Sequence, residues 1–162
     1  MYKRAAALCR RLSRWGGMVS GALIVALTLL ILTEIFSRSL FNHSTLIADE
    51  YSGYLYLALV FFGLAYTFEE NGHIRITLLT SRLKPRLQRL VDIFAAALSL
   101  AILLFALVYS WKFMWESKTM EMVSEGFSET PLYLTQIPMV IGLGLFACAM
   151  AFYLIRRIRD DQ

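Results

Sequence analysis

Four long stretches without a charged residue constrain this chain more than any other feature of its sequence. They lie between Arg14 and Glu34, Glu50 and Glu69, Asp92 and Lys112, and Glu129 and Arg156. The shortest, Tyr51–Phe68, has 18 residues. At about 1.5 Å per residue this is roughly 27 Å of helix, close to the thickness of a bilayer's hydrocarbon core. Each stretch is therefore long enough to span a membrane.

The composition agrees with a membrane protein. Hydrophobic residues make up 58% of the chain and charged residues 17%, whereas soluble domains have about 45–50% and about 25%. Four spans leave little chain for a domain outside the membrane. We therefore predict an all-α integral membrane protein with a single membrane domain over residues 1–162. The predicted spans cover about 15–36, 48–69, 90–111 and 131–155.

The net charge of +4 follows the predicted topology and does not indicate nucleic-acid binding. Most of the 16 basic residues precede the first span, fill the link between spans two and three, or follow the fourth span. Cytoplasmic segments of membrane proteins carry such an excess of Lys and Arg. Both termini and the middle link are therefore predicted to be cytoplasmic, in agreement with an even number of spans.

The middle link has the pattern of a short amphipathic helix over about 75–84. Its leucines fall on one helical face, and basic side chains gather beside them. Such a helix is expected to lie on the membrane surface, where anionic lipids attract the basic side chains. The predicted lipid-surface residues are Arg75, Arg82, Lys84, Arg86 and Arg89. A merely solvated basic loop is the alternative.

Small residues mark possible packing faces on the first and fourth spans. Gly17 and Gly21 stand four apart, and Gly142 and Gly144 lie in the fourth span. Glycines at such spacings let helices approach closely, although glycine is also simply common in membrane helices.

Charged residues mark the outer ends of the first two spans. Glu34 and Arg38 have the spacing of a helical ion pair, with snorkelling of both side chains as the alternative. Asp49 and Glu50 open the second span, where they either complement the helix dipole or contact a partner subunit.

Every ionisable residue lies at the end of a span or in a loop. A membrane enzyme or a self-sufficient transporter is expected to place such groups inside the membrane. No nucleophile–base pair, phosphate-binding loop or metal-binding spacing is present in the sequence, and Cys9 and Cys148 form no CxxC pair. The sequence therefore predicts a non-enzymatic scaffold without a cofactor, which accompanies a larger protein.

Several local motifs resemble the small membrane subunit (DctQ-type) of tripartite ATP-independent periplasmic, or TRAP, transporters. They are Glu34-Ile35-Phe36-Ser37-Arg38, Asp49-Glu50, Phe61-Phe62-Gly63 followed by Asn71-Gly72-His73-Ile74-Arg75-Ile76, Ser128-Glu129-Thr130-Pro131 and Ile137-Pro138. The chain departs from the family's common pattern at Gly53, where Arg is frequent, and at Ile47-Ala48, where Trp is frequent.

The resemblance implies an accessory subunit of a sodium-coupled importer of an organic acid in the bacterial inner membrane. Its partners would be a large (DctM-type) membrane subunit, which carries the sodium site, and a periplasmic (DctP-type) binding protein. The residues expected at the subunit interface are Gly17, Gly21, Glu34, Arg38, Asp49, Glu50, Gly63, Gly142 and Gly144. The acidic outer loop would be a docking surface for the binding protein, through Glu116, Glu121, Glu125 and Glu129.

Two alternatives belong to other classes. A small oligomeric exporter would need a carboxylate accessible within the membrane, and Glu34 is the candidate for it. A membrane redox or cytochrome subunit would need paired cysteines or histidines as ligands.

Overall fold

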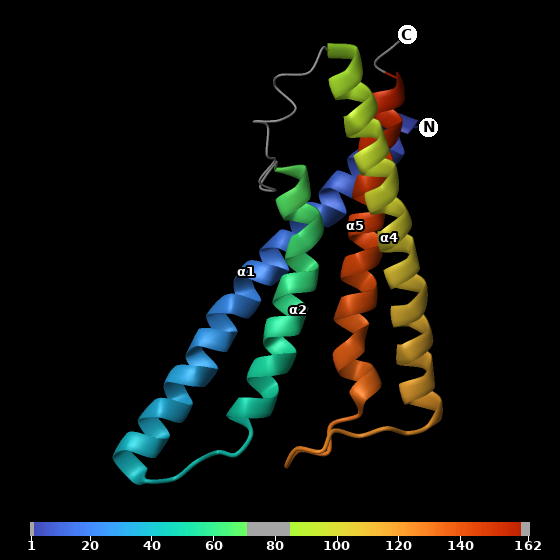
Figure 1. The fold of residues 1–162 in the computed structure, drawn as a ribbon. Helices are drawn as coiled ribbons and strands as arrows, with labels where there is room; N and C mark the ends of the chain where they lie inside the picture. Colours follow the sequence, from blue (N-terminus) through green and yellow to red (C-terminus); the bar gives the residue numbers. More distant parts are fainter. Residues whose placement is uncertain (1, 71–84, 160–162) are drawn as a thin grey trace.

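The computed structural model describes residues 2–70 and 85–159, and this part of the chain is a bundle of long helices (Figure 1). The helices are α1 (Tyr2–Phe41), α2 (Ala48–Glu69), α4 (Pro85–Thr119) and α5 (Leu132–Arg159). All four are long and apolar enough to cross a membrane. The predicted all-α membrane fold is confirmed. The interfacial helix predicted over about 75–84 lies outside the described residues.

The helices form two hairpins that meet through α2 and α5. Helix α1 packs on α2, α4 packs on α5, and α5 also contacts α2 and α1. The loops of both hairpins lie at one end of the bundle, and the start of α1 and the end of α5 lie at the other (Figure 1). We call the end with the two hairpin loops the loop end. Helix α5 is therefore the central element, and α1 and α4 are the flanks.

Two helices are longer than the sequence predicts. Helix α1 has 40 residues, or about 60 Å, which is twice the thickness of the hydrocarbon core. The basic residues before the predicted first span are part of the same helix. Helix α4 continues to Thr119, beyond the predicted end of the third span at about residue 111. Residues 112–119 contain no Gly or Pro that would end the helix. The helix therefore continues, and its backbone N–H and C=O groups stay hydrogen-bonded to one another.

Polar contacts tie α4 to α5 at the end away from the loops. Arg157 Nη2 lies 2.7 Å from Asp92 Oδ2, and Arg89 Nη2 donates to the carbonyl of Arg157 at 2.7 Å. The last carbonyls of a helix lack partners within that helix, so Arg89 supplies a donor to the end of α5. The two arginines thus join the beginning of α4 to the end of α5.

Close backbone contacts join the helices in the middle of the bundle. A Cβ added to Gly16 of α1 would lie 2.7 Å from the carbonyl oxygen of Phe62 in α2. A Cβ added to Gly142 of α5 would meet the backbone carbonyl of Phe61 in α2. It would also lie 2.7 Å from the Cβ of Phe61. Glycines in α1 and α5 therefore let both helices approach the backbone of one turn of α2, beside the fully buried Ala65.

This geometry predicts opposite effects for two nearby glycines of α5. Gly142→Ala should destabilise the chain by about 1–3 kcal/mol, because the added methyl group must push α5 away from α2. Gly144→Ala should be neutral or slightly stabilising, because a Cβ there meets no atom within 4 Å and alanine is the better helix former. Thermal unfolding of the purified variants in detergent measures both effects. Equal midpoints would contradict the proposed contact.

Candidate functional site

The carboxylate of Glu34 joins the end of α1 to the loop before α2. Glu34 is only 7% exposed. Its Oε1 accepts hydrogen bonds from Arg38 Nε at 2.5 Å and from the Ser44 hydroxyl at 2.7 Å. Its Oε2 accepts from the Thr45 amide at 3.1 Å and from the Thr45 hydroxyl. The predicted pair with Arg38 is formed, and the same carboxylate fixes the loop.

Arg38 and Asp49 remain accessible beside this buried carboxylate. Arg38 Nη2 lies 3.7 Å from Asp49 Oδ2, and the two side chains are 53% and 89% exposed. Exposed ion pairs of this kind contribute about 0–1 kcal/mol, so a partner could replace this contact at little cost. Of the four acidic and basic residues predicted at the subunit interface, these two are exposed, whereas Glu50 is half-buried and Glu34 is buried.

Glu50, at the start of α2, fixes the loop between α4 and α5. Its Oε1 accepts hydrogen bonds from the Tyr54 hydroxyl at 2.6 Å and from the Ser124 hydroxyl. Its Oε2 accepts from the Ser128 amide at 3.3 Å. Gly126 lies against this carboxylate, and a Cβ there would lie 2.5 Å from Glu50 Cδ. Glu50 therefore joins the two hairpins at the loop end of the bundle.

The loop held by Glu50 presents acidic side chains to the outside. Glu121, Glu125 and Glu129 are exposed in this loop, and Glu116 is exposed on the last turns of α4. Glu121 and Glu129 have φ angles of 49° and 45°, a conformation that non-glycine residues adopt at some energetic cost. The hydrogen bonds to Glu50 help to hold the loop in this shape. The four predicted docking residues thus lie at one end of the molecule.

The glycines predicted at the subunit interface divide into two groups. In the first group, neighbours within the chain fill the space: Gly17 faces the ring of Tyr66, Gly63 faces Ser20, and Gly142 faces α2. The second group consists of Gly21 and Gly144, where a Cβ would meet no atom from another element of the described part of the chain within 4 Å. The first group has a packing role inside the chain, and its contact with another subunit stays a prediction. The second group lies on faces that are open in this chain.

The face of α5 around Gly144 is apolar. Ile141 and Ile155 are 46% and 41% exposed, and Cys148 is exposed between them. These residues follow one another at spacings of three, four and seven positions, so they share one side of the helix. We call this set (Ile141, Gly144, Cys148 and Ile155) the open face of α5. It has the small central residues that helix packing in membranes favours.

The basic residues predicted at the lipid surface are only partly described. Arg86 is exposed at the start of α4. The guanidinium of Arg89 instead donates to the carbonyls at the end of α5. Arg75, Arg82 and Lys84 lie outside the described residues. Contact of these residues with lipid stays a prediction.

Sequence reasoning missed the donors to both carboxylates. The hydroxyl groups of Ser44, Thr45 and Ser124 supply most of the side-chain hydrogen bonds to Glu34 and Glu50. It also missed Gln136 of α5, which donates to the buried Ser117 hydroxyl of α4 at 3.1 Å. Both outer loops contain Ser and Thr close to acidic residues at helix ends, and this pattern could have indicated these hydrogen bonds.

In the part of the chain that the structure describes, no group of three or more His, Cys, Asp or Glu residues could hold a metal ion. That this chain holds no cofactor stays a prediction. The polar groups at the loop end bind the chain's own loops, and the long apolar helices leave faces uncovered. These features define a multi-pass helical membrane protein with uncovered apolar helix faces.

Comparison with known proteins identifies the family. The sequence model described as "Tripartite ATP-independent periplasmic transporters, DctQ component" matches residues 27–160. The chain therefore belongs to the DctQ family of small TRAP transporter permease subunits, a transporter component and not an enzyme. It is also similar to a Haemophilus influenzae protein provisionally named a TRAP transporter small permease protein, with 31% identity over 64 residues. That match covers 40% of this chain and 40% of the relative.

The hydrogen bonds of Glu50 predict how the acidic loop responds to substitution. Glu50→Gln should speed amide hydrogen exchange at Ser124 and Ser128 roughly tenfold or more, because bonds to a charged acceptor contribute about 1.5–3 kcal/mol. Glu125→Gln, an equal change of charge on an exposed side chain, is the control and should leave exchange unchanged. Equal exchange in the two variants would show that Glu50 does not hold the loop.

Proposed function

We propose that this chain is the accessory membrane subunit of a sodium-coupled importer that takes an organic acid from a periplasmic binding protein. It would pack against a large (DctM-type) membrane subunit that carries the sodium and substrate sites. The observation that carries this proposal is the open face of α5 on the central helix of the bundle. Helix α5 already contacts three other helices, yet at Gly144 it has a side on which no residue of the described ranges 2–70 and 85–159 lies within 4 Å of an added Cβ.

Membrane helices associate mainly through close packing, because lipid tails are as apolar as the side chains they would replace. A face with glycine at its centre and isoleucines at its ends fits this requirement. Gly21 offers a second open position on α1, where a Cβ would meet no atom within 4 Å. The large subunit would therefore contact the open face of α5 and the side of α1 that carries Gly21.

The loop end of the bundle would face the periplasm and help dock a (DctP-type) binding protein. Its exposed carboxylates at Glu121, Glu125 and Glu129 are held in place through Glu50. The basic residues support this orientation in the inner membrane, because most of those that the structure describes lie at the opposite end, and an excess of Lys and Arg is typical of the cytoplasmic side. Complementary charge mainly speeds encounter and orients partners, so docking should weaken as salt increases.

Sodium and the organic acid would bind the large subunit rather than this chain. The apolar stretches of all four spans lack Asp, Glu, Lys and Arg. Glu34 has its carboxylate oxygens engaged by Arg38 and the following loop. This engagement supports a structural role for Glu34 rather than the coupling carboxylate of a self-contained exporter.

The proposal predicts that bulk on the open face of α5 blocks assembly without unfolding the chain. Gly144→Leu should lower the amount of large subunit that co-purifies by roughly tenfold or more, since a poorly fitting side chain at a packed contact costs about 1–3 kcal/mol. Ala97→Leu, an exposed position of α4, is the matched control. Co-purification from membranes that contain both subunits measures the effect.

Two results would contradict this interface. One is undiminished co-purification of Gly144→Leu. The other is an equal loss of co-purified large subunit in Ala97→Leu. That result would show that added bulk at any exposed position reduces assembly, and not only bulk on the open face of α5. Thermal unfolding of each variant separates loss of assembly from loss of the fold.

A further inference from the structure

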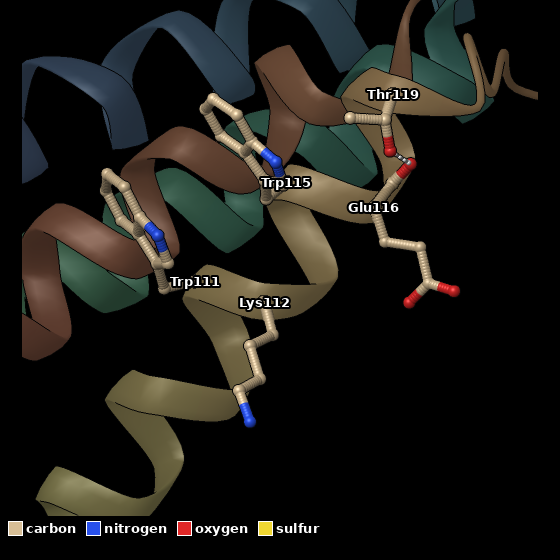
Figure 2. A pocket seen from close by; sticks show the side chains of 5 residues that line it. All are labelled: Trp111, Lys112, Trp115, Glu116 and Thr119. Carbon is tan, nitrogen blue, oxygen red and sulfur yellow. Dashed lines mark hydrogen bonds between the residues drawn. The ribbon is translucent and has the colours of Figure 1, made fainter.

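A shallow groove runs along the last turns of α4, near the loop end of the bundle. Its lining residues are Trp111, Lys112, Trp115, Glu116 and Thr119, and its volume is about 460 Å³. Figure 2 shows the two tryptophan rings following one side of the helix, while Lys112 and Glu116 project together from another side, away from the ribbon. The groove therefore combines an aromatic wall with one positive and one negative side chain.

Neither charge of the groove is balanced by an opposite charge within the described part of the chain. No ion pair joins Lys112 or Glu116 to any described residue. The ammonium of Lys112 lies 5.3 Å from the ring centre of Tyr109, a cation–π contact that leaves its N–H groups able to donate. Residues four apart on a helix have their Cβ atoms about 5–6 Å apart. One small molecule that carries both charges can therefore reach both side chains.

We expect the groove to lie at the depth of the lipid headgroups. The uncharged stretch of α4 ends at Trp111, and Lys112 is the first charged residue after it. Tryptophans gather where the hydrocarbon core meets the headgroups, and both are 53% exposed here. From Trp111 to Thr119 the helix rises about 12 Å, enough to cross the headgroup layer on one side of the bilayer.

A second lysine contacts one ring of the aromatic wall. Lys118 Nζ lies 5.6 Å from the ring centre of Trp115 and 5.9 Å from that of Tyr133 on α5. The charge of Lys118 therefore lies against the rings of Trp115 and Tyr133. Lys112 and Glu116 are left as the charged pair available to a ligand.

We propose that this groove binds the headgroup of phosphatidylethanolamine. The Lys112 ammonium donates to the lipid phosphate, and the Glu116 carboxylate accepts from the primary ammonium of the ethanolamine. The acyl chains follow the apolar surface of α4 below Trp111, where Phe105 and Val108 are exposed. A primary ammonium has three N–H donors for the carboxylate, whereas the trimethylated amine of phosphatidylcholine has none. This lipid site is separate from the subunit contact proposed on α5.

The test uses the full chain in nanodiscs of mixed phosphatidylethanolamine and phosphatidylcholine with identical acyl chains. Native mass spectrometry of the released protein gives the ratio of the two lipids that stay bound. Wild type should retain the ethanolamine lipid in preference. Lys112→Gln/Glu116→Gln should lower this ratio roughly tenfold, because the ethanolamine lipid loses its charge-assisted hydrogen bond to Glu116, which the choline lipid cannot make. Arg11→Gln/Glu70→Gln removes the same charges from exposed positions at the other end and should leave the ratio unchanged.

A second measurement follows the groove itself. In a Trp15→Phe background, Trp111 and Trp115 are the remaining tryptophans. Their fluorescence should shift with rising phosphatidylethanolamine content and saturate, and the double variant should abolish the shift. The proposal is overturned if wild type shows no lipid preference or if the double variant keeps it. It is also overturned if the double variant keeps the lipid preference of wild type but no longer binds the periplasmic binding protein. That result would make the groove a protein-docking site.

Discussion

Backbone-to-backbone contact at one turn of α2 is the interaction on which this bundle depends. In a bilayer the hydrophobic effect does little to bring apolar helices together, so close packing must supply the attraction. Gly16 and Gly142 let α1 and α5 approach the carbonyls of Phe62 and Phe61 on neighbouring sides of α2. This contact joins the two hairpins and makes α5 the central helix.

Polar contacts at the two ends complete the structure because the middle of the membrane tolerates few of them. Arg157 and Arg89 join α4 to α5 at one end, while Glu34 and Glu50 hold the loops at the other. Since these carboxylates serve the chain itself, the sides left for other molecules are apolar faces and exposed rim charges. A chain built in this way suits an accessory member of a transport complex.

The sequence predicts the helices better than it predicts their contacts. Runs without charge gave the four spans, but helix α4 extends past Lys112, because a charged residue at the surface does not end a helix. The Glu34–Arg38 pair could be predicted, since both residues lie on one helix. The contact of Glu50 with Ser124 spans 74 positions, and no local spacing indicates it. Likewise, Gly142 and Gly144 look alike in sequence, and only the packing of α5 on α2 distinguishes them.

Substrate uptake by reconstituted proteoliposomes tests the accessory role most directly. Three preparations are compared: liposomes with this chain alone, with the large subunit alone, and with both. Each receives the substrate-loaded binding protein and an inward sodium gradient. The account predicts uptake only when both membrane subunits are present. Uptake by liposomes that contain this chain without the large subunit would contradict it.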